Sequence, residues 1–328
     1  MIAFELGVED LADTRFAASP LAETVFGLWT LSDPGRQPLH LPWLRSVRPR
    51  IASLDIPLLL SLVGESRALP DFLTPRPASF APGIDEELAT VRATDPQVVR
   101  RDLIATHRPG SLPEPLAAAR GSADGPVAAL RDEICDLLAS YWKAAVKPAW
   151  PQMRLVLEAD MTYRAGRLAT GGARRLFADL HPNLAWRDGT LYIDQMIGRH
   201  RVSASGRGLL LIPSVFAYKP VPPLSPDEPP WIAYPSRGVA TLWAPAPEPD
   251  ATALVSLLGA TRARLLDMLG EPLPTIEMAR RLGVTPSAVS QHLRVLHAAG
   301  LLTRVRHGRH VLYRRGRLAN ELAGRARG

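Results

Sequence analysis

The sequence predicts an α+β N-terminal domain, with a helical body and a small antiparallel sheet, followed by a smaller domain of helices and a β-hairpin. Helical periodicity dominates up to about residue 180, strand-like runs follow from Leu184, and a second helical pattern begins after a proline-rich stretch. Eleven of the 32 prolines lie between Pro213 and Pro249. Because helices do not survive that density of proline, we divide the chain into domains at 1–250 and 251–328.

The N-terminal domain begins with a strand-like run, IAFEL, and then a helix from Pro20, where proline suits a first helical turn. Apolar spacing predicts further helices at 40–50, 55–64, 84–92 and 95–107. The strongest helical signal covers 126–147, where apolar residues recur every three or four positions: Val127, Leu130, Ile134, Leu137, Leu138 and Tyr141. A second long helix is expected from about 151 to 169, ending at Gly171-Gly172.

Short β-like runs replace the helical pattern from Leu184 onward. They read LAW, TLYID, RVSAS and GLLLIP, and turns are expected at Asp188-Gly189 and between Gly206 and Gly208. This order predicts the small antiparallel sheet. Two more strand-like runs, WIAY at 231 and VATLW at 239, lie within the proline-rich stretch, which ends in a connector at 244–250.

Composition excludes several classes of protein. The 328 residues are 46% hydrophobic and 22% charged. This supplies enough apolar side chains for hydrophobic cores and argues against global disorder. The single cysteine, Cys135, excludes an internal disulfide and a thiolate cluster. No apolar run approaches the roughly 20 residues of a membrane span, and acids stand where a secretory signal would be basic. We expect a cytoplasmic, nucleoid-associated protein that does not bind a membrane.

The net charge of +7 is distributed unevenly. Residues 260–328 hold thirteen arginines and four acids, a charge of +9, while the rest holds 26 cations and 28 acids, a charge of −2. A basic module attached to a near-neutral body is typical of proteins that bind a polyanion such as DNA.

The sequence of the basic region predicts a clear order of secondary-structure elements. Thr275 is expected to cap a short helix through Leu282, Gly283 to Thr285 to make a turn, and Pro286 to open a helix over 286–299 that stops at Gly300. Two helices joined by a short glycine turn form a helix-turn-helix. The following LLTRVR and RHVLYRR, around His307-Gly308, predict a β-hairpin wing over 301–314, and so a C-terminal winged helix-turn-helix domain.

From about Leu254 to Tyr313 the sequence resembles the ArsR (arsenical-resistance repressor) family of bacterial transcription regulators. The stretches that carry the resemblance are TRARLLDML, VSQHLRVLHAAGLL and GRHVLY. The rest resembles, more loosely, a long region of unknown function that precedes such a domain in some actinobacterial regulators, through DTRF, LHLPW and GRGLLLIPSVF. The resemblance implies a DNA-binding regulator, a repressor, that binds a pseudo-palindromic operator in double-stranded DNA as a homodimer.

The helix from Pro286 has an apolar and a polar face. Val289, Leu293 and Leu296 are expected to pack inward, which leaves short hydroxyls and an amide near the N-terminus of the helix for the major groove. In the wing, arginines are expected to reach the DNA backbone while Val305 and Val311 face the sheet. The predicted DNA-binding residues are Thr285, Ser287, Ala288, Ser290, Gln291, Arg294, Arg304, Arg306 and Arg309.

We expect no metal site and no cofactor. Thiolate sensors of the ArsR type place a cysteine pair on the helix that here reads PTIEMARRL, and zinc sensors place histidines in the tail that here reads GRLANELAGRARG. His307 and His310 lie beside arginines that would repel a cation.

The role of the N-terminal domain is left open between three alternatives. It could hold a small organic effector or form the dimer, it could be a ligand-converting enzyme fused to a DNA-binding tail, or it could be a protein-interaction scaffold. Charged residues on the helix from 151, including Asp160 and Arg164, are expected on a solvated face. No nucleophile elbow or phosphate-binding loop occurs, so we predict no enzyme. Aromatic residues that could line a pocket are Trp29, Trp43, Trp142, Trp150, Tyr163, Trp186, Tyr192 and Trp231.

Overall fold

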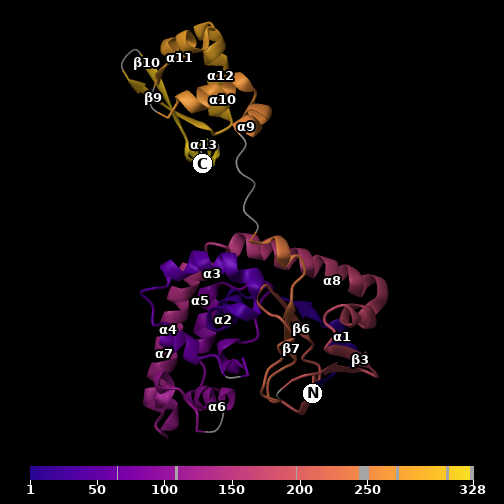
Figure 1. The fold of residues 1–328 in the computed structure, drawn as a ribbon. Helices are drawn as coiled ribbons and strands as arrows, with labels where there is room; N and C mark the ends of the chain where they lie inside the picture. The colour runs from indigo at the N-terminus through magenta and orange to yellow at the C-terminus, as the bar shows by residue number, and fades with distance from the viewer. Residues whose placement is uncertain are drawn as a thin grey trace. The chain divides into compact units, whose positions relative to one another are not determined.

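The computed structural model describes residues 1–328 except 65, 108–109, 197, 244–250, 271–272, 308–309 and 326–328, and it leaves undescribed the side chains of 251–253, 305–307, 310, 321 and 323–325. The chain forms two compact units, residues 1–244 and 245–328, which are described separately below (Figure 1). The predicted connector at 244–250 lies outside the described residues.

The first unit is mixed, with helices at each range where the sequence predicts one. Apolar residues from many of these helices meet in one core, which also includes Trp43, Phe72 and Cys135. The α-helices are α1 (Val8–Ala12), α2 (Pro20–Ser32), α3 (Leu41–Val47), α4 (Ile56–Ser61), α5 (Ile84–Arg92), α6 (Pro96–Thr106), α7 (Asp124–Tyr141) and α8 (Trp150–Ala178).

The first long helix ends where the sequence predicts, and the second continues past its predicted end. α7 continues into a π-helical turn, Trp142–Val146, before the KPAWP segment. α8 runs to Ala178, but Gly171 and Gly172 leave the helical conformation inside it, and Gly172 has a φ of +62°. The break that the two glycines predict is therefore confirmed, because glycine alone adopts such a φ without strain.

The strands form two sheets, so the prediction of one antiparallel sheet was wrong, although the predicted hairpin across Asp188-Gly189 is present and antiparallel. The first sheet has the order β3-β4-β1-β5, in which β1 pairs with β4 antiparallel and with β5 in parallel. The second has the order β2-β6-β7 and is parallel throughout. The strands are β1 (Ile2–Glu5), β2 (Arg15–Phe16), β3 (Leu184–Arg187), β4 (Thr190–Ile193), β5 (His200–Ser203), β6 (Leu210–Ser214) and β7 (Trp231–Pro235).

The parallel sheet separates two apolar cores. On β6, Leu210 and Ile212 belong to the core of the helical body, whereas Leu211 belongs to a second core with β1, β4 and β5. All of β6 is buried, as expected for a strand of a parallel sheet covered on both faces. The last strand-like run, VATLW, is not a strand: Val239–Thr241 forms a 3₁₀-helix.

Asp160 and Arg164 form a buried ion pair on α8, so the prediction that these charges lie on a solvated face was wrong. Arg164 Nε lies 3.5 Å from Asp160 Oδ1, and the two side chains are 2% and 0% exposed. The Tyr234 hydroxyl on β7 donates a hydrogen bond to Asp160 Oδ2 at 2.8 Å. Arg164 donates a hydrogen bond to the backbone carbonyl of Asp179. The sheet covers these charges, which the helical periodicity of α8 does not reveal.

Glu87 on α5 holds the N-terminus of α2. Its carboxylate accepts hydrogen bonds from Ser19 Oγ at 2.5 Å and from the Leu21 backbone N–H at 2.9 Å. Ser19 in turn caps α2 by accepting from the Ala22 N–H. Burial raises the pKa of Glu87 to about 7, although these hydrogen bonds oppose the rise.

We predict that Glu87→Gln becomes more stable relative to the native chain as the pH rises from 4.5 to 7. A carboxyl whose pKa is higher in the folded than in the unfolded state contributes stability at low pH, and that stability is lost as the pH rises. The shift corresponds to about 3 kcal/mol. Urea unfolding at several pH values measures it, with the exposed Glu86→Gln as control; a difference independent of pH would contradict the prediction.

The second unit combines helices with a three-stranded sheet of order β8-β10-β9. Its core gathers Leu266, Met278, Leu293, Leu302 and Tyr313, among others. Gly259, with a φ of +82°, precedes α10. Pro274 occupies the N-cap of α11, so the prediction that Thr275 caps this helix was wrong. The elements are α9 (Ala251–Leu258), α10 (Ala260–Met268), β8 (Leu273–Pro274), α11 (Thr275–Leu282), α12 (Pro286–Ala298), β9 (Leu302–His307), β10 (His310–Arg315) and α13 (Arg317–Arg325).

In the described part of the chain, no helix has both the length and the apolar character that a membrane crossing requires.

Candidate nucleic-acid interface

The turn between α11 and α12 is built from three residues. Gly283 adopts the left-handed conformation that ends α11, with φ and ψ of 67° and 31°. The Val284 N–H returns to the Ala279 carbonyl at 3.1 Å. Thr285 then caps α12, because its hydroxyl accepts a hydrogen bond from the Ala288 N–H at 3.3 Å. Pro286 follows as the first helical residue, where its missing N–H costs no hydrogen bond.

One face of α12 is buried in the core of the second unit. Val289 and Leu293 are fully buried and Leu296 is 1% exposed, as the spacing predicts. They pack with Met278 of α11 and Leu266 of α10. This packing fixes the rotation of α12 about its axis and so determines which side chains face away from the core.

The opposite face presents the polar residues that the sequence singles out. Thr285, Ser287, Gln291 and Arg294 are exposed, and Ala288 and Ser290 are half-buried. The hydroxyls of Thr285 and Ser287 lie 2.9 Å apart, and Arg294 Nε donates weakly to the Ser290 carbonyl at 3.4 Å. Arg294 lies just beyond the middle of α12, and the other five lie on or next to its N-terminal half.

The β9-β10 hairpin follows directly, and only part of its predicted set is described. Arg304 is exposed and lies opposite Tyr313 in the register. Arg306 lies opposite Val311, but its side chain and the whole of Arg309 are outside the described residues, as is the side chain of Val305. Val311 is 40% exposed, so the prediction that it faces the sheet was wrong.

The apolar side of the hairpin is instead made by Leu302 and Tyr313, which are 3% and 9% exposed. Val311 lies farther along β10, opposite Arg306 and next to the turn. The hairpin therefore packs on the helices where β9 begins and β10 ends, and the valine beyond Tyr313 lies outside the apolar contact.

Several arginines of the basic region already have partners within the unit. Arg280 and Arg281 on α11 both bind Glu277, with N–O distances of 2.7 Å, and these bonds lower the pKa of Glu277 to about 2. Arg315 donates to the carbonyls of Leu266 and Asp267 at 2.6 Å each, at the end of α10. These three arginine side chains are therefore already engaged within the unit.

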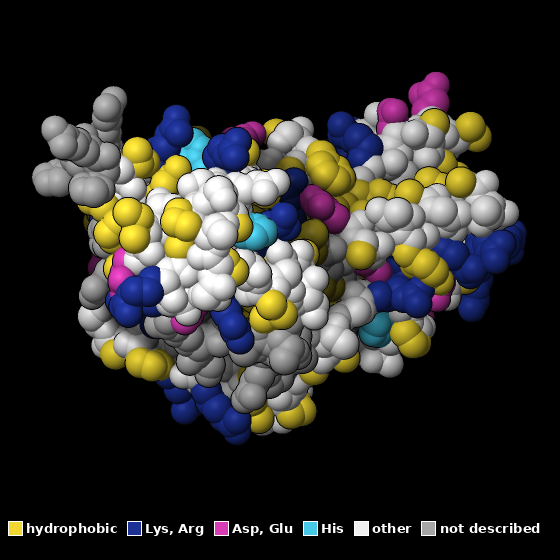
Figure 2. Space-filling view, turned by 90° about the horizontal axis from the view of Figure 1, so that it is seen from above, with side chains coloured by type: hydrophobic (Ala, Val, Ile, Leu, Met, Phe, Trp, Pro, Cys, Tyr) yellow, Lys and Arg dark blue, Asp and Glu magenta, His cyan; other side chains and the backbone are white. Residues whose placement is uncertain are grey.

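Two further exposed arginines, Arg264 on α10 and Arg314 on β10, are absent from the predicted set. Among the residues that the structure describes, neither has a carboxylate partner, and the same holds for Arg294 and Arg304. Arg280 and Arg281 have their partner on the same helix. The partner of Arg315, the end of α10, is distant in sequence, so only the folded unit reveals that contact. On the face in Figure 2, Lys and Arg side chains are more prominent than Asp and Glu.

Comparisons with known proteins agree with this geometry. Residues 257–305 match a family described as a helix-turn-helix domain, a stretch that covers α10, α11, α12 and the start of β9. Neither the curated proteins nor the solved structures yielded a match. The chain therefore carries a C-terminal helix-turn-helix domain of the kind found in DNA-binding regulators.

Proposed function

We propose that the protein is a sequence-specific transcriptional regulator of the ArsR type, a repressor that reads DNA through helix 286–299. The observation that carries the proposal is the exposed polar face of α12, formed by Ser287, Gln291 and Arg294 opposite the buried face. Gln can bind adenine through two hydrogen bonds, and Arg can do the same with guanine. The N-terminus of α12 suits an approach to phosphate.

The hairpin acts in this proposal as the wing of a winged helix-turn-helix. Arg304 is exposed on β9, opposite Tyr313 of β10, and has no carboxylate partner among the described residues. Its role is to bind a backbone phosphate, which adds affinity without distinguishing sequences. Arg306 and Arg309 have the same proposed role.

The regulator acts as a homodimer in this proposal. α9 has the sequence ATALVSLL and no charged residue, yet Val255 is 40% and Leu257 72% exposed. On α13, which also packs against α10, Leu318 is 51% exposed. A second copy would cover these apolar side chains, and two recognition helices would then read successive major grooves, about 34 Å apart, on a pseudo-palindromic operator.

The test begins with selection of bound fragments from the host genome, followed by titration of the selected duplex and of random DNA. Gln291→Ala is expected to weaken binding to the selected duplex by roughly 5- to 150-fold, and to leave binding to random DNA unchanged, because one bidentate base contact is worth about 1–3 kcal/mol. Arg304→Ala is expected to weaken both, and to lower the slope of log K against log salt by about 1.

Arg48→Ala, an exposed arginine of the first unit, serves as the control and is expected to leave affinity and slope unchanged. An equal loss on both DNAs for Gln291→Ala would remove its base-reading role. A slope that stays constant in Arg304→Ala would remove the phosphate contact.

A further inference from the structure

A cavity of about 330 Å³ opens beside β2 in the first unit. Arg15 and Phe16 of β2, Leu210 of β6 and the segment at 77–80 line it. Arg15 pairs with Leu210 in the register, so the parallel sheet brings the stretches DTRF and GRGLLLIPSVF, which are distant in sequence, to the same wall. The volume is in the range of pockets that bind small molecules, roughly 300 to 1,000 Å³.

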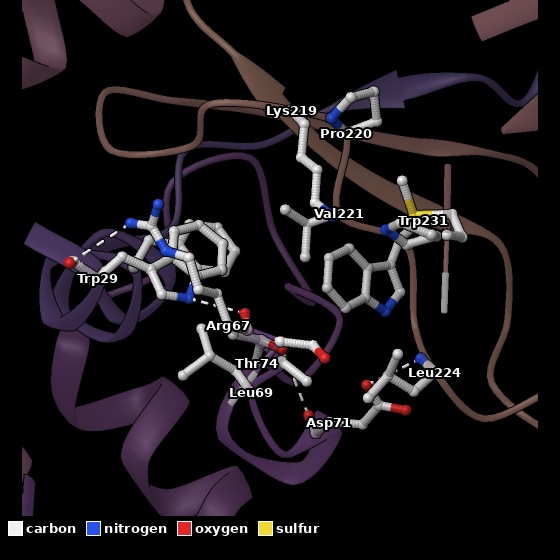
Figure 3. A pocket seen from close by; sticks show the side chains of 15 residues that line it. Trp29, Arg67, Leu69, Asp71, Thr74, Lys219, Pro220, Val221, Leu224 and Trp231 are labelled. Carbon is white, nitrogen blue, oxygen red and sulfur yellow. Dashed lines mark hydrogen bonds between the residues drawn. The ribbon is translucent and has the colours of Figure 1, made fainter. Parts of the chain in front are cut away.

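The pocket drawn in Figure 3 is much smaller. Trp29 and Trp231, two of the aromatic residues that the sequence offers for a pocket, line it, but they are only 2% and 3% exposed. It holds about 50 Å³, which is room for a few water molecules and not for a ligand between the indoles. The cavity beside β2 is therefore the better site for a ligand.

The walls of the larger cavity are held by the backbone. The Arg15 N–H donates to the Leu209 carbonyl at 2.9 Å, and the Ala18 N–H donates to the Phe80 carbonyl at 2.9 Å. Phe16 packs against both apolar cores of the unit, whereas the Phe80 side chain is 55% exposed. The walls therefore exist before a ligand enters, and a ligand would cover the apolar surface that Phe80 leaves in water.

Three arginines gather beside this cavity. Arg15 lines it, and Arg76 directly precedes Pro77, another lining residue. Arg76 Nη2 donates to the Arg207 carbonyl at 2.9 Å. Burial lowers the pKa of Arg76, and the charges of Arg15 and Arg207 lower it further. The three like charges therefore lie close enough to repel one another, and an anion bound among them would relieve the repulsion.

Two acids lie near the arginines, and neither lines the cavity. Asp10 Oδ1 accepts from the Gly206 and Gly208 N–H groups at 2.9 and 3.1 Å, so it holds the turn that carries Arg207. Burial raises the pKa of Glu228, and the charge of Arg207 opposes the rise. Of the described residues that line the cavity, Arg15 is the one with a charge.

We propose that this cavity binds a small amphipathic carboxylic acid. Its apolar chain lies along Phe16 and Phe80, and its carboxylate lies at Arg15, because a guanidinium can bind both carboxylate oxygens at once. One charged group in the lining matches the single charge of a carboxylate better than the two of a phosphate. As the site of the regulator's effector it rests on the proposed function, but the binding itself does not depend on how α12 reads DNA.

The test is calorimetric titration of the full chain, without DNA, by octanoate, 1-octanol and acetate. Octanoate is expected to bind, and octanol to bind at least tenfold more weakly, because octanol lacks the charge that Arg15 complements. Acetate is expected to give no measurable binding, because it keeps the charge but buries almost no apolar surface.

Two variants separate the charged from the apolar part of the site. Arg15→Gln is expected to reduce the preference for octanoate over octanol to less than threefold, while Arg45→Gln, an exposed arginine on α3, leaves it unchanged. Phe80→Ala is expected to weaken octanoate and octanol alike by about three- to tenfold and to keep the preference. Leu39→Ala is its control, since Leu39 is 43% exposed elsewhere in the unit.

Melting temperatures within a few degrees of native show that the variants fold. Because Arg15 and Phe80 are both exposed, each variant locates the site by itself if the other does not fold. No heat of binding from octanoate, decanoate or 4-phenylbutyrate up to 10 mM would overturn the inference. Equal affinity for octanoate and octanol, or octanoate binding that neither variant changes, would also overturn it.

Fluorescence anisotropy on the selected duplex measures DNA binding separately. Octanoate binding without DNA binding would reject the proposed function and keep the cavity as a binding site. DNA binding without octanoate binding would reject the cavity alone.

Discussion

Replacing Leu257 with Glu is expected to weaken operator binding by a hundredfold or more. Leu257 is 72% exposed on the apolar helix α9, and the proposed dimer would bury it against a second copy. A glutamate there would be desolvated without a partner, and the chain would become monomeric. A monomer loses the effective concentration that joins two half-sites, which is commonly worth a factor of 10² to 10⁴.

Sedimentation equilibrium and anisotropy on a full and a half operator measure this effect. The half operator is expected to bind native chain and variant almost equally, because α12 is unchanged. Leu155→Glu is the matched control, since Leu155 is 67% exposed on α8 of the first unit. If Leu257→Glu keeps the native mass and affinity, α9 is not the dimer contact.

Arg164→Met is expected to lower the free energy of unfolding of the first unit by about 3–5 kcal/mol, the usual cost of leaving one partner of a buried ion pair unpaired. Asp160 would remain fully buried, with the Tyr234 hydroxyl and the Arg237 N–H as its remaining hydrogen-bond donors. Urea unfolding followed by far-ultraviolet circular dichroism measures the change.

The matched control for this prediction lies on the same helix. Arg154 Nε is 2.6 Å from Glu158 Oε1, but the two side chains are 49% and 36% exposed, so Arg154→Met is expected to cost less than about 1 kcal/mol. The double variant Arg164→Met with Asp160→Asn should recover part of the loss, because no unpaired charge remains. Equal effects of the two single arginine variants would show that burial does not decide the strength of these pairs.

The helices could be predicted from the sequence because their signals are local. Pro20, Pro96 and Pro286 each open a helix, and Gly283 ends α11 as expected. These residues act on the backbone within a turn or two of their own position, so no tertiary contact is needed to read them. The same reasoning located the glycine turn and the polar face of α12.

Apart from the local β3-β4 hairpin, the strand pairings could not be predicted because the partners are distant in sequence. Arg15 on β2 pairs with Leu210 on β6, and Ile2 on β1 pairs with both Ile193 and His200. Period-two patterns identify a strand but carry no information on a partner nearly two hundred residues away or on its direction. An antiparallel sheet of consecutive strands was therefore the simplest expectation, and the wrong one.

The sequence by itself determined the elements with local causes: the helices, the helix-turn-helix with its capped second helix, and the +9 charge of residues 260–328. Only the tertiary structure decided that Arg315 is engaged at the end of α10, whereas the pair of Arg281 and Glu277 is local to α11. It also brought Trp29 and Trp231 to one pocket. Such contacts join residues that are far apart in the sequence. Sequence patterns record only the periodicity of each element and not what packs against it.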